Sequence, residues 1–256
     1  MTRLFAWFGS FILGLVREAG GTFLLGVRCL QALFSRRMEW REALRQGNHF
    51  GVGSLLVLTS TAGLVGGILV VQAGLYVKRY GIQELVGWLV GFGVLREIGP
   101  LVAGLVFSGR VGSRNAAEIA AMSTRDQLDG LRAIGIDVVP VVIAPRAAAM
   151  AFSLVSLYFL GAVVSVLVAA GASWVLLNVD GPQFERSFFT RTQVADVGMG
   201  LAKSVAFALA VALISCRAGL AARGGATAVG DAAKNAVVRA AFAIVVLDLV
   251  VARVLG

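Results

Sequence analysis

Residues 147–177 read AAAMAFSLVSLYFLGAVVSVLVAAGASWVLL, a run of 31 residues without a charged side chain. With a helical rise of about 1.5 Å per residue, this run would be about 46 Å long. The hydrocarbon core of a bilayer is about 30 Å thick, so such a helix can cross it by tilting or by emerging from it. The stretch therefore predicts a helical membrane protein.

Four other stretches have the length and apolar character of membrane spans. They are residues 51–77, 85–107, 197–216 and 236–255. Together with residues 147–177 they make five predicted transmembrane helices. We therefore predict an all-α integral membrane protein, with a five-span membrane domain over residues 50–256.

The overall composition agrees with a membrane protein. Hydrophobic residues make up 58% of the chain and charged residues 14%, whereas soluble domains are nearer about 45–50% and about 25%. The net charge of +9 would suggest nucleic acid in a soluble protein, but basic residues also set membrane orientation. We expect no nucleic-acid partner. Two cysteines, Cys29 and Cys216, and one histidine, His49, are too few for a disulfide framework or a metal site.

Residues 1–49 are predicted to form an N-terminal interfacial amphipathic segment, or elbow helix, ahead of the first span. Residues 4–16 are apolar, and Arg3, Arg17 and Arg28 fall on one side of a helical wheel. A single basic stripe on an apolar helix is typical of an element lying in the plane of the membrane interface. The pair Gly20-Gly21 leaves open a division into two shorter helices.

Lysine and arginine counts predict the orientation. Segments 36–49, 108–146 and 217–239 hold four, five and four of these residues, and the alternate segments 78–84 and 178–196 hold two each. Cytoplasmic loops carry the excess of basic residues. The amino terminus is therefore predicted in the cytoplasm and the carboxyl terminus outside, as an odd number of spans requires.

The segment after the second span is predicted to contain a short amphipathic cytoplasmic helix. Thr124 to Gln127 has the pattern of a capping box, which would start a helix near Arg125, and Gly135 is suited to end it. Between them, apolar and charged side chains alternate with helical spacing: Leu128, Leu131 and Ile134 on one side, and Asp126, Asp129 and Arg132 on the others. Such a helix can dock into a groove of a partner or pack on its own membrane domain, and the pattern alone does not decide between these.

Charged and helix-breaking residues interrupt the second span. Arg96 and Glu97 are followed by Gly99 and Pro100, and proline removes a backbone donor, so a kink or break is expected there. A charge at the bilayer centre costs on the order of 3 kcal/mol, so neither side chain should face lipid. Broken helices at membrane depth are frequent at transport sites. An internal ion pair that only fixes helix packing is the alternative.

Two more charges lie within predicted spans, Lys203 in the fourth and Asp248 in the fifth. With Arg96 and Glu97 they form a set without net charge. In a helix bundle this polar cluster could bind a zwitterionic or anionic head group while apolar walls accept acyl chains. Salt bridges that only compensate one another are the alternative, and the sequence does not show which residues pair.

No motif for ATP binding or catalysis is present. The sequence has no GxxxxGK[ST], and residues 200–204, GLAKS, lack the glycine that precedes the lysine of a P-loop. The single histidine, His49, has no acid-base partner nearby in the sequence, whereas an intramembrane hydrolase would need such groups within its spans. We therefore predict that the chain is not an enzyme.

Three stretches carry a resemblance to a known family. They are LREIGPLVAGLVFSGRVGS at 95–113, AAEIAAMSTRDQLDGLRAIGID at 116–137, and the region from GLAKSVAFALAVALISC at 200–216 through GGATAVGDAAKNAVV at 224–238 to Asp248. In order and spacing the chain after residue 45 resembles the MlaE/YrbE permeases of ABC transporters, which work with MCE-domain proteins. It departs from that pattern at Arg114-Asn115, at Val138 and over the loop 178–196.

The resemblance implies a homodimeric phospholipid permease of the bacterial inner membrane with a periplasmic carboxyl terminus. ATP would be bound by a separate ATPase subunit and no cofactor by this chain. The segment from Asp126 to Ile134 would be the coupling helix that enters the ATPase groove, and a periplasmic MCE-domain protein would relay lipid. Arg96 and Glu97 match the family's polar position near the lipid pocket, and Lys203 and Asp248 match its other membrane charges.

Two functions remain open at this stage. One is ATP-driven lipid transport, and the other is a membrane scaffold whose buried charges only hold helices together. The sequence does not indicate the direction of transport or the exact lipid. It also leaves open whether a small cytoplasmic regulatory subunit joins the complex.

Overall fold

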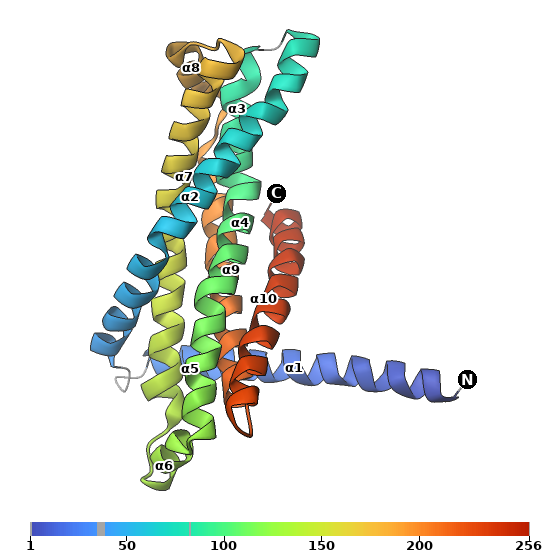
Figure 1. Ribbon diagram of the computed structural model, residues 1–256, viewed down its shortest axis with the longest axis vertical. Coiled ribbons are helices and arrows are strands. Elements are labelled where there is room, and N and C mark those ends of the chain that lie inside the picture. The colour runs from blue at the N-terminus through green and yellow to red at the C-terminus, as the bar shows by residue number, and fades with distance from the viewer. Residues whose placement is uncertain (1, 35–38, 82, 256) are drawn as a thin grey trace.

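The computed structural model describes residues 2–34, 39–81 and 83–255, and every regular element in these ranges is a helix. Figure 1 shows a tall bundle in which α2 (Trp40–Tyr80), α7 (Ala144–Leu177) and a rod of consecutive helical segments (residues 83–124) run along the long axis. The short helix α8 lies at one end and α6 at the other. The predicted all-α fold is confirmed.

The elements follow one another with few connecting residues. In chain order they are α1 (Thr2–Phe34), α2 (Trp40–Tyr80), η1 (Gln83–Leu85), α3 (Val86–Gly91), η2 (Phe92–Glu97), α4 (Ile98–Phe107), η3 (Ser108–Gly112), α5 (Ser113–Thr124), α6 (Gln127–Ala133), η4 (Val139–Ile143), α7 (Ala144–Leu177), α8 (Gly181–Arg191), α9 (Val194–Leu220) and α10 (Ala226–Leu255). The segments η2, η3 and η4 are π-helical, and η1 is a 3₁₀-helix.

Four helical stretches in the described part of the chain are long and apolar enough to cross a membrane. They are Trp40–Val77, Gln83–Thr124, Val139–Leu177 and Val194–Leu220, and each contains most or all of one of the first four predicted spans. The predicted fifth span lies within α10, which is 30 residues long and carries Arg239, Asp248 and Arg253 within the predicted span.

Two predicted boundaries differ from the helices observed. Helix α2 begins at Trp40, so the division expected at residue 49 lies inside a continuous helix. The second span was expected to end at residue 107, but the rod continues through η3 and α5 to Thr124. The polar pattern of α5 concealed a helix whose Ala116, Ile119 and Ala120 are fully buried, because packing can favour a helix wherever one face is covered.

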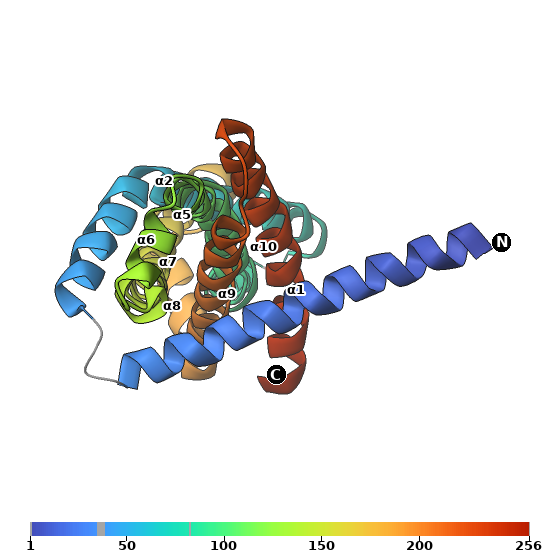
Figure 2. The ribbon, with the colours of Figure 1, turned by 90° about the horizontal axis from the view of Figure 1, so that it is seen from below.

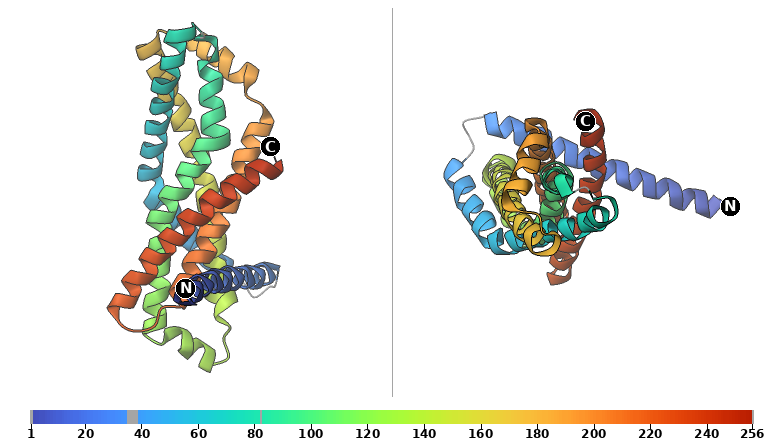
Figure 3. Two further views of the ribbon diagram at one scale, coloured as in Figure 1. Left: turned by 90° about the vertical axis from the view of Figure 1, so that its right-hand side faces the viewer. Right: turned by 90° about the horizontal axis from the view of Figure 1, so that it is seen from above.

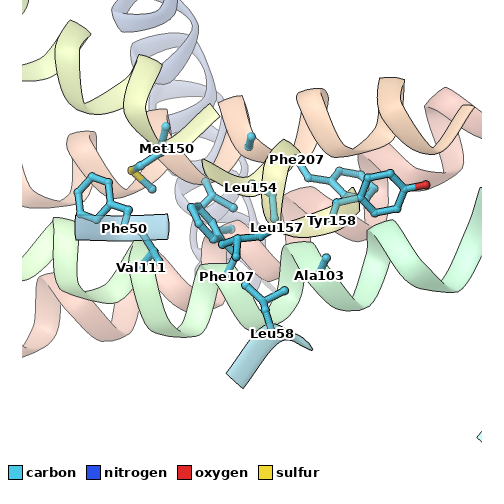
Figure 4. Close-up of a cluster of buried hydrophobic side chains, with 14 of the residues drawn as sticks. Phe50, Leu58, Ala103, Phe107, Val111, Met150, Leu154, Leu157, Tyr158 and Phe207 are labelled. Carbon is cyan, nitrogen blue, oxygen red and sulfur yellow. The ribbon is translucent and has the colours of Figure 1, made fainter. Parts of the chain in front are cut away.

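A large apolar core joins α2, α4, α7, α9 and α10. Phe107, Met150, Leu154 and Phe207 have no exposed surface, and Figure 4 shows their side chains converging with those of Phe50 and Leu58. Side chains from five helices thus meet in one cluster, which fixes the positions of the helices that carry the intramembrane charges.

Helix α1 lies across the bundle near the end that carries α6. It runs almost perpendicular to the long axis, and its amino-terminal half projects beyond the other helices (Figures 1 and 2). Its carboxyl-terminal half is attached through buried Leu25, Cys29 and Ala32. Glu18 adds ion pairs to Arg239 of α10 at 2.7 Å and Arg217 of α9 at 3.4 Å.

The segment that was predicted to be cytoplasmic forms a helical hairpin that starts differently from the prediction. The capping box is wrong: Thr124 ends α5 and its hydroxyl donates back to Ala121 O, while Asp126 precedes α6 in a left-handed conformation without a side-chain cap. The predicted stop is confirmed, since Gly135 has φ of 80° and its N–H donates to Arg132 O. Arg36 and Arg37, which entered the charge count, lie outside the described residues.

The loop predicted at residues 178–196 contains helix α8, which covers the opposite end of the bundle (Figure 1). Helix α8 packs on α3, where a side chain at Gly87 would overlap the backbone of Phe184 and Phe188. The close approach also brings the Ser187 hydroxyl to Glu84 O at 2.5 Å. The end of the bundle is therefore closed by an ordered helix.

Candidate functional site

Lys203 is the centre of the charged site. Its side chain is fully buried among the helices, and its Nζ donates to Glu97 Oε2 at 2.5 Å. The same Nζ lies 2.9 Å from Asp248 Oδ1, an ion pair without hydrogen-bond alignment. Helices α9 and α10 and the end of η2 thus contribute one charge each to a single cluster.

Arg96 extends this cluster toward the α8 end. Its Nη1 donates to Asp196 Oδ1 at 3.1 Å, and its Nε lies 3.7 Å from Glu97 Oε1. The guanidinium carbon is 5.4 Å from the centroid of the Phe92 ring, a distance typical of a cation–π contact. All four charges expected from the sequence are therefore joined through direct contacts.

Asp196 is a fifth member that the sequence analysis missed. It lies in the first turn of α9, where its Oδ2 accepts the Gln193 N–H at 2.9 Å and completes a capping box. The spacing from Gln193 to Asp196 is a helix-start signal that would have moved Asp196 from the predicted loop into the span. The capping role alone would not have indicated the contact with Arg96.

The charges alternate in sign along the network. The order is Asp248, Lys203, Glu97, Arg96 and Asp196, with three carboxylates and two cations. Lys203 has no exposed surface and Asp196 only 7%, whereas Glu97 is 33% exposed and Asp248 23%. The network is therefore closed at Lys203 and Asp196 and partly open at Glu97, at Asp248 and at Arg96, which is 26% exposed.

A π-helical turn positions Arg96 and Glu97. Over η2 the backbone widens, and the Ile98 N–H donates to Gly93 O, five residues back. A side chain at Gly99 would overlap Val94 O, so the wide turn requires glycine there. A kink or break was predicted at Gly99 and Pro100, and the structure has a local π-helical distortion there in a continuous rod.

Tyr158 and Gly200 support this turn from neighbouring helices. The Tyr158 hydroxyl donates to Leu95 O at 2.6 Å, and a side chain at Gly200 would overlap both of these groups. In a π-helix each N–H donates to the carbonyl five residues back, so an N–H at position 100 would point to Leu95 O. Pro100 has no N–H to donate. The hydroxyl of α7 thus donates to a carbonyl that the proline cannot reach.

A second polar cluster lies toward the α6 end of the bundle. Arg146 of α7 donates to Glu118 of α5 at 2.8 Å and to Asn115 Oδ1 at 3.2 Å. The Asn115 amide donates in turn to Ser215 of α9 at 2.8 Å, and Arg114 pairs with Glu118 at 3.0 Å. These contacts join α5 and α7, the helices before and after α6, in a polar junction.

Helix α6 presents a mixed surface. Leu128 is buried and Leu131 packs against the same apolar cluster, but Ile134 is 71% exposed. Asp129 and Arg132 form an exposed ion pair at 2.7 Å. On the predicted apolar side, Leu128 and Leu131 therefore pack on the bundle, whereas Ile134 at the carboxyl end is exposed.

The two cysteines lie apart from the charged network. Both Cys29 and Cys216 are free thiols and buried, and burial raises the pKa of Cys29 to about 12. In the ranges that the structure describes, no three histidine, cysteine or acidic side chains gather in a way that could hold a metal ion.

Comparison with known proteins places these features in a family. The family model described as Permease MlaE matches residues 43–254, which is most of the chain. The chain belongs to the MlaE permease family. A protein named as a probable ABC transporter permease from Synechocystis is 33% identical over 228 residues, covering 89% of this chain and 86% of the relative.

Two other relatives extend the comparison. A probable ABC transporter permease from Rickettsia typhi is 30% identical, covering 83% of this chain and 82% of its own. The chloroplast protein Trigalactosyldiacylglycerol 1 of Arabidopsis thaliana is 29% identical over 84% of this chain and 61% of its own length. This MlaE permease is thus a multi-pass membrane subunit of an ABC transporter, and its family implies a separate ATPase partner.

Proposed function

We propose that this MlaE permease moves phospholipids between the bacterial inner membrane and a periplasmic MCE-protein carrier, powered by a separate ATPase subunit. The observation that carries the proposal is the five-charge network at the π-helical turn, with Glu97 and Asp248 partly open. Charges at membrane depth are costly and usually serve a substrate path. The name of the Arabidopsis relative refers to a glycolipid, which favours a lipid substrate.

The proposal includes five spans and an interfacial α1. Helix α10 begins near the α6 end and crosses the bundle obliquely toward its carboxyl terminus (Figure 3), and its acid Asp248 is paired with buried Lys203. Helix α1 crosses the bundle at right angles with exposed Leu13, Phe23 and Leu24, as an element in the interface plane would. The amino terminus and α6 are then cytoplasmic and the carboxyl terminus periplasmic.

The proposed complex is a homodimer with two ATPase subunits, each receiving one α6 as a coupling helix. The exposed carboxyl end of α6, with Ile134, supports this docking. Helix α10 also has a row of exposed apolar side chains, including Phe242, Val245 and Leu249, which can face lipid or a second copy. An MCE-domain protein would sit on the α8 side. A small cytoplasmic regulatory subunit is compatible with the α6 side.

The test is charge reversal at Glu97. Glu97→Lys would place two lysines together beside Asp248, so we expect lipid transfer by the reconstituted complex to fall by more than roughly tenfold, given a cost on the order of 3 kcal/mol for unpaired charge at membrane depth. Lipid transfer from proteoliposomes to the MCE protein is the measurement. Asp231→Lys, at a position of α10 that is 68% exposed, is the matched control and should transfer lipid normally.

The same experiment separates transport from scaffolding. Native mass spectrometry of each variant reports assembly and bound lipid. A transporter predicts that the Glu97→Lys complex keeps its subunits and loses transfer. If the wild-type complex is folded yet neither carries nor transfers lipid, and charge reversal only weakens assembly, then the network is a structural brace and the chain is a scaffold.

A further inference from the structure

The charged network contains one carboxylate more than it has cations. Among the residues that the structure describes, Asp196, Glu97 and Asp248 form ion pairs with Arg96 and Lys203 alone, and no side chain in the set is more than 33% exposed. An uncompensated charge among membrane helices is costly unless a partner neutralises it. The site therefore lacks one positive charge.

Both cations of the network are already engaged. Lys203 Nζ lies between Glu97 and Asp248 and has no exposed surface. Arg96 spans Asp196 and Glu97, and its Nε, which has no hydrogen-bond acceptor, is itself buried. A phosphate or carboxylate from a ligand would compete with Asp196 and Glu97 for Arg96, which is 26% exposed.

The part of the network that a ligand can reach has two acids for one cation, because Arg96 is 26% exposed beside Glu97 and Asp248. Glu97 and Asp248 are partly exposed and share the single ammonium of Lys203. A second ammonium beside these carboxylates would supply the missing charge and up to three hydrogen-bond donors. An anionic head group at the same place would add to the negative charge.

Building on the proposed transport function, we infer that the open carboxylates of Glu97 and Asp248 receive the ammonium of a zwitterionic aminophospholipid. The site then selects phosphatidylethanolamine over phosphatidylglycerol when the acyl chains are the same. A proton shared by the carboxylates is the other way to complete the charge, and it would give no preference between these lipids.

The test is a competition on the intact permease–ATPase complex. The complex is incubated with equal amounts of phosphatidylethanolamine and phosphatidylglycerol carrying identical acyl chains, and the bound lipids are counted by native mass spectrometry. We expect enrichment of phosphatidylethanolamine by roughly fivefold to tenfold, the scale of one charge-assisted hydrogen bond.

Neutral variants identify the source of the preference. Glu97→Gln and Asp248→Asn each leave two carboxylates for two cations, so either change should bring the ratio of bound lipids close to that of the mixture. Asp231→Asn removes an acid that is 68% exposed and only weakly paired on α10, and it should keep the wild-type ratio. Using two variants guards against one that fails to assemble.

Each result decides a different point. Equal binding of the two lipids by the wild type, or a preference for phosphatidylglycerol, overturns the inference and leaves lipid transport intact. A preference that survives in both neutral variants also overturns it, since the selectivity would then arise elsewhere. If the folded wild-type complex binds neither lipid, the proposed transport function fails together with this inference.

Discussion

The hydroxyl of Tyr158 reaches a backbone carbonyl at the point where the rod changes register. It donates to Leu95 O at 2.6 Å, in the place where Pro100 has no N–H to offer. A buried carbonyl that loses its partner costs about 1–3 kcal/mol. The geometry of Arg96 and Glu97, which follow Leu95 directly, therefore depends on a residue 63 positions further along the chain.

We expect Tyr158→Phe to destabilise the protein by about 1–3 kcal/mol, because the Leu95 carbonyl then loses the hydroxyl that donates to it. Thermal unfolding in detergent is the measurement, and lipid transfer should fall with it. Tyr76→Phe, at a position 59% exposed, is the matched control. Equal unfolding temperatures for the two variants would show that the hydroxyl does not hold the turn.

Several residues of the site could be predicted from the sequence and others could not. Arg96, Glu97, Lys203 and Asp248 are conspicuous because charges are rare in apolar runs, and the structure brings all four together. Tyr158 and Gly200 lie in stretches where tyrosine and glycine are ordinary. Their role arises only from the approach of α7 and α9 to the π-helical turn, which no local pattern encodes.

At the scale of elements, α6 connects α5 and α7, which are joined to each other by a polar junction. Arg146 at the start of α7 donates to Glu118 and Asn115 of α5, and α5 leads directly into the turn before α6. A force applied to α6 would therefore reach α5 and α7 together. Since α5 continues the rod that carries η2, the polar junction offers a continuous route from the hairpin to the charged network.

We expect Ile134→Asp to abolish co-purification of the ATPase subunit. Ile134 is 71% exposed on α6, so the change costs the isolated permease little stability, but a charge in a hydrophobic groove of the partner would lack a counter-charge. Affinity purification of the tagged permease measures the bound ATPase. Ile134→Val is the control, and retention of the ATPase by Ile134→Asp would exclude this end of α6 from the contact.

Element boundaries were predictable only where the apolar pattern stops at a recognisable signal. Gly135 ends its segment as expected, with φ of 80°. Residues 108–124 looked like a loop because they mix Arg110, Arg114 and Glu118 with small residues. They are helical because Ala116 and Ile119 pack without exposed surface and Arg146 pairs with Glu118, both contacts made by distant parts of the chain.

At the scale of the whole molecule, the direction of α10 determines whether the two ends of the chain share a side of the membrane. Four stretches are long and apolar enough to be spans, and α10, which carries Arg239, Asp248 and Arg253, is not among them. Asp248 is paired with Lys203, which lowers the cost of placing it among the helices. Pairing therefore makes a fifth crossing feasible.

The native thiols leave the chain suited to accessibility mapping. Cys29 and Cys216 are buried, and desolvation raises the pKa of Cys29 to about 12. At pH 8 its reactive thiolate form is therefore scarce, because the pH lies well below the pKa. We expect the wild-type protein to remain unlabelled by a maleimide that does not cross membranes, in intact and in lysed cells alike.

Single cysteines then report the side on which each element lies. We expect Thr190→Cys on α8 and Val254→Cys near the end of α10 to be labelled in intact cells, and Arg125→Cys in the turn before α6 to be labelled only after lysis. These three positions are exposed, so burial cannot account for a difference. Labelling of Val254→Cys only after lysis, beside normal labelling of Thr190→Cys, would mean that α10 turns back and that four helices cross. The Lys203–Asp248 pair would then hold a re-entrant α10 among the four spans, because Lys203 is the tenth of the 27 residues of α9 and keeps its depth in either topology.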